Sequence, residues 1–174
     1  MRLALGDDPV STIPKPLEQM FEAHHGMVFR TAYRITGNAA DAEDVLQTVF
    51  LRLLRRDPAA PAEIGNPESY LRRSAVNAAL DVVRARHESD TLEPERLPAS
   101  GSCTELRELR DTLRQELSKL PARTAEMFAL RFFEGYTNPE IARLMGLSQI
   151  VVAVTLHRAR RKLQQEMTRK GATR

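Results

Sequence analysis

The fold of this chain is constrained most strongly by the residues between Thr137 and Leu163. Thr137 followed three positions later by Glu140 is the capping-box signature of a helix start. Gly146 can take the left-handed conformation that ends a helix tightly, and Ser148 is a good N-cap for a second helix. The pattern therefore predicts a short helix, a tight turn and a longer helix, over residues 138–145 and 149–168.

The longer predicted helix has one apolar stripe and one strongly basic end. Val152, Leu156, Ala159 and Leu163 follow one another at helical spacing, and the residues directly after His157 are mostly Arg and Lys. A short helix, a glycine turn and an amphipathic second helix form the unit that places its second helix in the major groove of DNA. An ordinary helical hairpin has the same spacing, but the basic end favours a phosphate-bearing partner.

Helical periodicity continues through most of the remaining chain. It predicts helices over 17–36, 38–56, 67–87, 105–119 and 122–133, with Gly37 ending the first of them. Residues 1–16 predict a flexible leader, and residues 88–104 predict an acidic linker that is either a tether or a mimic of nucleic-acid charge. We therefore expect an all-α protein with two small helical domains joined by a flexible acidic linker.

The composition excludes several classes of protein. Trp is absent and aromatic residues are 5% of the chain, so the core depends on aliphatic side chains. The only cysteine, Cys103, has no intramolecular disulfide partner, and no Cys/His spacing suits zinc. No signal peptide and no apolar run of membrane-spanning length is present, and no nucleophile–base set indicates catalysis. We expect a non-enzymatic cytoplasmic protein without metal or cofactor.

Two blocks of the sequence resemble the extracytoplasmic-function (ECF) sigma factors, which are RNA polymerase specificity subunits of the sigma-70 family. Residues 33–53 resemble regions 2.1 and 2.2, residues 70–86 resemble regions 2.3 and 2.4, and residues 117–163 resemble region 4. The resemblance implies region 2 over 17–87, a linker over 88–104 and region 4 over 105–170. Its implied partners are core RNA polymerase (the β′ clamp helices and the β subunit), promoter DNA and, in many members, an anti-sigma factor.

In this family the second helix of region 2 docks on the β′ clamp helices. Acids near the start of that helix also stabilise the helix dipole, and core packing is the favoured role for Phe50. The resemblance implies core-polymerase contacts by Asp41, Asp44, Gln47, Phe50 and Leu53.

The third helix resembles the element that opens and reads the −10 promoter region. Asn77 stands where the family places an asparagine that contacts an unpaired base, and an amide can donate and accept at a base edge. The arginines either contact phosphates or form a solvated helix face. The implied −10 contacts are Arg72, Arg73, Asn77, Arg84 and Arg86.

The recognition helix departs from the family pattern. Ala153 and Thr155 stand where Lys and Arg are common, so Arg-to-guanine readout is missing there and we expect an unusual or weaker −35 contact. Ile150, Val151 and Val154 either touch thymine methyl groups or are buried against the other domain or an inhibitor protein. The implied −35 contacts are Arg143, Ser148, Gln149, Val151, Thr155, His157, Arg158, Arg160 and Arg161.

Two other functions compete with the sigma-factor hypothesis. A DNA-binding regulator would use the N-terminal helices for dimerisation or for sensing a signal. A protein-interaction adaptor would have lost DNA binding, as the valines of the recognition helix suggest. Binding to core polymerase with start-site selection separates a sigma factor from both alternatives.

Overall fold

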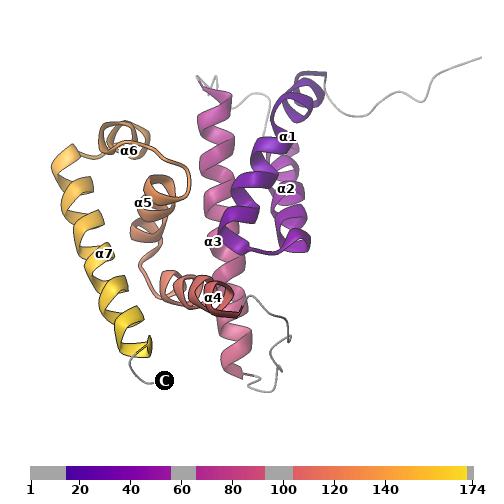
Figure 1. Cartoon of the computed structure of the whole chain (residues 1–174). Coiled ribbons are helices and arrows are strands. Elements are labelled where there is room, and N and C mark those ends of the chain that lie inside the picture. Colours follow the sequence, from indigo (N-terminus) through magenta and orange to yellow (C-terminus); the bar gives the residue numbers. More distant parts are fainter. Residues whose placement is uncertain (1–14, 56–65, 93–103, 172–174) are drawn as a thin grey trace, which may run out of the picture.

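The computed structural model describes residues 15–55, 66–92 and 104–171, and all the regular structure in these ranges is helical (Figure 1). The fold class predicted from the sequence is confirmed for this part of the chain. The helices are α1 (Lys15–Thr36), α2 (Ala39–Leu54), α3 (Pro67–Leu92), α4 (Thr104–Ser118), α5 (Ala122–Phe132), α6 (Asn138–Met145) and α7 (Gln149–Gly171).

Most predicted helix bounds agree with the structure to within three residues. The exception is α3, which continues to Leu92 instead of ending near His87. The first five residues of the predicted linker are therefore helical. The rest of that linker up to residue 103, residues 1–14 of the predicted leader and most of the loop before α3 lie outside the described residues.

Helices α1, α2 and α3 form an N-terminal bundle around an aliphatic core. Val28, Val49 and Leu71 are among its fully or almost fully buried side chains. Gly37, with a φ of 68°, turns the chain between α1 and α2 in the left-handed conformation that glycine adopts without strain. Asn38 then caps α2, because its side-chain oxygen accepts a hydrogen bond from the backbone N–H of Asp41.

Helices α4 to α7 form a C-terminal bundle that contains the predicted helix-turn-helix. Both halves of the Thr137–Glu140 capping box are present, and Gly146 ends α6 with a φ of 64°. The axes of α6 and α7 differ in direction by 111°, within the range of helix-turn-helix units. Ile141 and Val152 are fully buried between them, so the turn holds α7 at a fixed angle.

Glu116 ties the start of the C-terminal bundle to its end. Its buried carboxylate accepts hydrogen bonds from Lys119, at 2.8 Å, and from Lys170 at the end of α7, at 2.9 Å. Burial alone would raise the pKa of Glu116, but the two ammonium groups outweigh burial and lower it below its ordinary value. The ionised carboxylate therefore stabilises the packing of α4 against α7.

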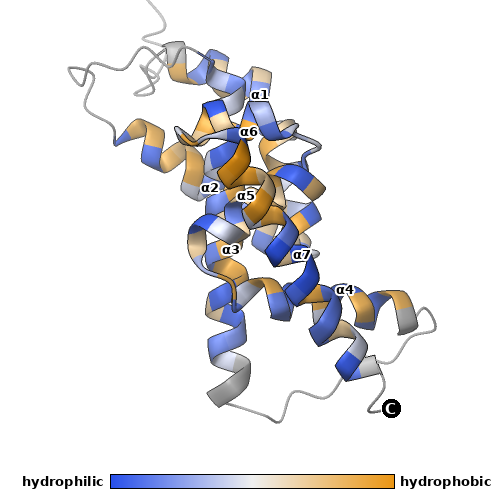
Figure 2. Cartoon of the chain, turned by 90° about the vertical axis from the view of Figure 1, so that its left-hand side faces the viewer, coloured by the Kyte–Doolittle hydropathy of each residue, from blue (hydrophilic) through white to orange (hydrophobic). Residues whose placement is uncertain are grey.

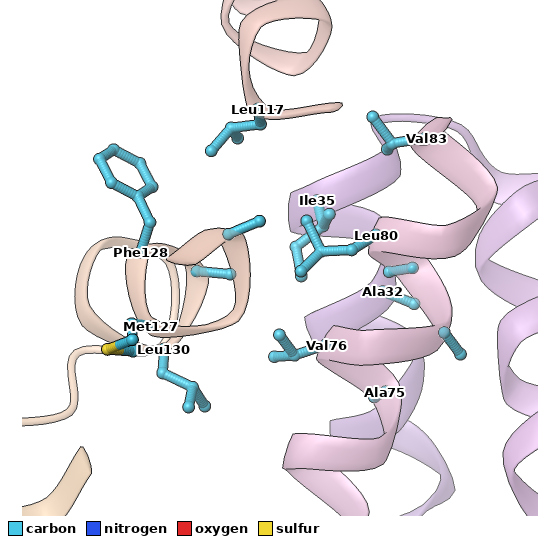
Figure 3. Packing of buried hydrophobic residues seen from close by; sticks show 14 of the residues in the cluster. Ala32, Ile35, Ala75, Val76, Leu80, Val83, Leu117, Met127, Phe128 and Leu130 are labelled. Atoms are coloured by element: carbon cyan, nitrogen blue, oxygen red, sulfur yellow. The ribbon is translucent and has the colours of Figure 1, made fainter. Parts of the chain in front are cut away.

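The two bundles share one apolar core. Figure 3 shows Val76 and Leu80 of α3 directed toward α5, where Leu130 is fully buried. Leu117 of α4 and Phe128 of α5 belong to the same buried cluster. The C-terminal bundle therefore lies directly against α3.

This contact changes which residues of α3 are buried. Helical spacing predicts one buried side of α3, formed by Tyr70, Leu71, Ser74, Ala75, Ala78, Val82 and Val83. The structure also buries Val76, Ala79 and Leu80, because α3 is covered by α1 and α2 on one side and by α4 and α5 on another. Tyr70, expected on the buried side, is 37% exposed.

None of the described helices is, by itself, both long and apolar enough to cross a membrane; the bent pair α6 and α7 meets those limits only when the two are taken together. Within residues 15–55, 66–92 and 104–171, no cluster of three or more His, Cys, Asp or Glu side chains could hold a metal ion.

Candidate nucleic-acid interface

Helix α7 presents a basic face to solvent. Its stripe of Val152, Leu156, Ala159 and Leu163 is buried against the rest of the C-terminal bundle, as the spacing predicts. The residues between these positions therefore project outward, and Figure 2 shows much of α7 as hydrophilic. The exposed predicted −35 residues of this helix and of α6 include His157, Arg158, Arg160, Arg161 and Arg143.

The N-terminal turn of α7 combines polar and apolar surface. Ser148 is occupied as the N-cap, since its hydroxyl accepts a hydrogen bond from the N–H of Val151 at 3.3 Å. Gln149 is exposed and Thr155 is half-buried. Ile150, Val151 and Val154 are 76%, 46% and 43% exposed, so the alternative in which they are buried against the other domain is wrong for this structure. The inward stripe of α7 supplies its packing, which leaves these three side chains uncovered.

Arg72 of α3 is held by a carboxylate of the C-terminal bundle. Its Nη1 lies 2.7 Å from Oε2 of Glu134, a residue of the turn between α5 and α6 whose side chain is fully buried. Arg34 also pairs with Glu134 at 2.9 Å, and the hydroxyl of Thr31 donates to it at 2.9 Å. Burial alone would lower the pKa of the Arg72 guanidinium, but hydrogen bonds with Glu134 and Glu68 outweigh it and raise that pKa.

Arg73 and Asn77 are held by a second carboxylate. Oε1 of Glu126 on α5 lies 2.5 Å from Nε of Arg73 and accepts a hydrogen bond from the Asn77 amide at 3.2 Å. Arg73 also donates to the backbone carbonyl of Leu144 in α6, at 3.0 Å. Three of the five predicted −10 residues thus contact the C-terminal bundle.

The other two predicted −10 residues form pairs within the N-terminal bundle. Arg84 lies 3.2 Å from Asp81 on the same helix. Arg86 lies 2.8 Å from Asp41, which is one of the predicted polymerase contacts, and remains 49% exposed. Asp41 therefore lies in the first turn of α2 and links this helix to α3.

The exposed face of α2 differs in part from the predicted polymerase contacts. Asp44 and Gln47 are exposed, as a docking role requires, and Leu53 is half-buried. Phe50 has the core-packing role that was favoured for it: it is only 8% exposed and packs edge-on against Phe21, with ring centroids 4.9 Å apart, which argues against the polymerase contact implied by the resemblance. A buried ring in the core offers little contact surface to another protein.

Two leucines of α2, Leu51 and Leu54, are exposed, although helical spacing places Leu54 on the apolar face of the helix. Leu51 and Leu54 are 47% and 45% exposed. Leu51 comes four residues after Gln47, and Leu54 comes three residues after Leu51, so both lie on the side of the helix that carries Asp44 and Gln47. We call these four residues the α2 stripe. The helical spacing from Asp44 was a signal that could have identified them.

Glu126 and Glu134 were also missed. Glu126 interrupts a run of buried apolar residues from Ala125 to Leu130, where an ionised side chain requires a partner. That local signal existed in the sequence, but it does not name the partner. Glu134 follows α5 in a turn and carries no comparable signal.

Comparisons with known proteins agree on one family. Residues 20–88 match the model of Sigma-70 region 2, and residues 110–163 match that of Sigma-70, region 4. The RNA polymerase sigma-E factor of Streptomyces avermitilis is 30% identical over 153 residues, covering 86% of this chain and 84% of that protein. The ECF RNA polymerase sigma factor SigE of Mycolicibacterium smegmatis is 30% identical over 155 residues, covering 84% of this chain but 60% of that protein.

Two solved structures show more distant likeness. The sigma factor RpoE of Bartonella quintana, in complex with the anti-sigma factor NepR, has a TM-score of 0.49 at 17% identity, covering 89% of this chain and 98% of that chain. The ECF sigma factor SigJ of Mycobacterium tuberculosis has a TM-score of 0.47 at 24% identity, covering 83% of this chain and 52% of that chain.

Proposed function

Because the chain belongs to the sigma-70 family as an ECF sigma factor, whose members direct RNA polymerase to promoters, we propose that its helices divide this task. In the proposal α2 binds core polymerase, α3 opens and reads the −10 region, and α7 binds the −35 region. The observation that carries the proposal is the geometry of α7, whose apolar stripe is buried in the bundle while its basic face is exposed.

The α2 stripe is the proposed surface for core polymerase. Asp44 can pair with basic residues of the β′ clamp helices, Gln47 can exchange hydrogen bonds, and Leu51 with Leu54 can bury apolar surface. Exposure of two large apolar side chains beside a carboxylate favours a protein partner over solvent. This assignment replaces Phe50 with Leu51 and Leu54.

The proposed −10 surface is the side of α3 that carries Arg72, Arg73 and Asn77. The two guanidinium groups suit phosphates, and the amide of Asn77 suits the edge of a base that has left the stack. Promoter melting in this proposal consists of holding such a base after the duplex opens. Arg84 and Arg86 extend the cationic surface along the same helix.

The proposed −35 contact relies on phosphates and methyl groups. His157 and the exposed arginines of α7 bind the DNA backbone, while Gln149 and Thr155 are the polar groups near base edges. The exposed side chains of Ile150, Val151 and Val154 can pack on thymine methyl groups. We therefore propose a −35 element in which A·T pairs are preferred at these positions, because no arginine there reads guanine.

An anti-sigma factor remains a predicted partner. The exposed apolar side chains at the start of α7 and the α2 stripe are the surfaces that such a protein could cover.

Run-off transcription tests the proposed function. The purified chain is mixed with core RNA polymerase and a promoter selected from a random library, and transcript start sites are mapped. A sigma factor selects a defined start site; a regulator binds duplex DNA alone and selects none. Failure to bind core polymerase or to support initiation contradicts the proposal.

Two variants separate the roles of α2 and α3. Leu51→Ala with Leu54→Ala should weaken core binding while leaving binding to duplex DNA unchanged. Asn77→Ala should retain core binding and reduce promoter opening, measured by permanganate reactivity of unpaired thymines. Each variant is the control for the other, and loss of core binding by Asn77→Ala would show that Asn77 is structural.

A further inference from the structure

We infer that this sigma factor inhibits itself, with Glu126 and Glu134 of the C-terminal bundle occupying the −10 DNA-binding groups of α3. The inference rests on the proposed function, which assigns Arg72, Arg73 and Asn77 to DNA. In the structure these side chains contact the protein's own carboxylates. The closed arrangement therefore competes with promoter DNA for the same donors.

Glu134 takes the place that a DNA phosphate would occupy beside Arg72. Its carboxylate accepts from two guanidinium groups, those of Arg34 and Arg72, and from the hydroxyl of Thr31. A carboxylate and a phosphate present similar anionic oxygen pairs to an arginine. The fully buried Glu134 side chain has exchanged its water for these donors, so DNA can reach Arg72 only after Glu134 leaves.

Glu126 blocks the residue proposed to read a base. One of its oxygens accepts from both Arg73 and Asn77, and the Glu126 residue is only 5% exposed. One of the two N–H donors of the Asn77 amide is thereby used within the protein. The carbonyl of Leu144 takes a further donor of Arg73.

The contact between the bundles extends beyond these ion pairs. Arg114 of α4 donates to the backbone carbonyl of Ile35 at 2.9 Å, near the end of α1 where a cation is favourable. It lies over Gly37, at which any Cβ atom would collide with the guanidinium. Together with the shared apolar core, this fitted contact indicates a defined closed state.

The closed state is too small to contact both promoter elements at once. Elements at −35 and −10 lie roughly 25 base pairs apart, about 85 Å along B-DNA. A compact fold of this length has a radius of gyration of about 16 Å and thus a diameter of about 40 Å. Promoter binding by both bundles therefore requires their separation, which also frees Arg72, Arg73 and Asn77.

The test compares the whole chain with the double variant Glu126→Gln and Glu134→Gln. Small-angle X-ray scattering measures opening as an increased radius of gyration. Fluorescence anisotropy measures affinity for a labelled single-stranded DNA of mixed sequence. Because self-inhibition means that the open state is a minor population of the wild type, the variant should bind this DNA roughly tenfold or more tightly. The control Glu18→Gln with Glu22→Gln removes the same charge from exposed positions of α1 and should change neither quantity by a comparable amount.

Arg34→Ala provides a second test that does not depend on the folding of a buried-site variant. Arg34 is 45% exposed at its side chain and holds Glu134, but the proposed function gives it no DNA contact. Its removal should open the protein and strengthen DNA binding although a positive charge is lost. The loss of a positive charge would by itself weaken DNA binding, so a gain in affinity cannot be explained by general electrostatic attraction.

An unchanged radius of gyration in both the double variant and Arg34→Ala would overturn the inference, and so would opening without a gain in DNA affinity. Equal gains in DNA affinity by the double variant and by its charge-matched control would also overturn the inference, because the removed negative charge alone would then explain the result. These outcomes are independent of run-off transcription, so failure of the proposed function is distinguished by the loss of initiation and core binding.

Discussion

Replacing Arg158, Arg160 and Arg161 with alanine should flatten the salt dependence of DNA binding. All three side chains are exposed on α7, between the positions that pack into the bundle. Alanine is the residue most favourable to a helix, and the buried stripe is unchanged, so α7 should keep its fold. The substitutions therefore remove charge without removing the surface that supports it.

The size of the effect follows from counterion release. Each phosphate contact contributes about 0.9 to the slope of log K against log salt, so three contacts contribute about 2.7. Between about 50 and about 200 mM salt, a slope difference of about 2.7 corresponds to a roughly 40-fold change in relative affinity. The wild type should lose that much more affinity than the variant over this range.

The assay is fluorescence anisotropy with a labelled duplex of mixed sequence, titrated at several KCl concentrations. A second variant, with Arg30, Arg52 and Arg55 replaced by alanine, removes three exposed arginines from α1, α2 and the C-terminal cap of α2. Its slope should remain near that of the wild type. An unchanged slope in the α7 variant, or an equal loss in the matched control, would refute a phosphate role specific to α7.

Three further predictions concern stability. Thr137→Ala should lower the free energy of unfolding by about 1 kcal/mol in urea titrations, because the capping box of α6 is lost, whereas Thr137→Ser should restore most of it. The pKa of Glu116 is lowered by Lys119 and Lys170, so the stability that its carboxylate contributes is present above pH 4.5 and is lost as pH falls through the folded pKa. Thermal melts of Glu116→Gln should therefore show a smaller loss of melting temperature in acid than those of the wild type. Parallel curves of melting temperature against pH for the two proteins would contradict this. Gly37→Ala should destabilise the fold by more than the ~1–2 kcal/mol expected from its positive φ alone, since the new Cβ would displace the Arg114 guanidinium, which donates to the Ile35 carbonyl. Gly146→Ala is the matched control, because it has a similar φ with open space around its Cβ position.

The helices and the helix-turn-helix could be predicted because their signals are local. Gly37, Asn38, Thr137 and Gly146 act on the backbone within a few residues of themselves, and the structure places each at the predicted helix end. The exposed basic face of α7 was predictable for a similar reason, since helical periodicity assigns buried and exposed positions within one helix.

Periodicity was less reliable where a helix has several apolar faces. In α2, apolar residues outnumber the positions that one buried stripe can hold, and the rotation of the helix in its bundle decides which are covered. Phe50 is buried and Leu51 is exposed although both are apolar neighbours. That rotation depends on how α1 and α3 pack against α2.

By itself, the sequence determined the all-helical fold, the capped helix-turn-helix and, through its two matching blocks, the sigma-factor family. Only the tertiary structure decided where the C-terminal bundle lies, and therefore that Arg72, Arg73 and Asn77 contact Glu126 and Glu134. These partners are separated along the chain by 49 residues or more. No local rule links residues so far apart; they meet because the apolar second side of α3 and the buried face of α5 must both be removed from water.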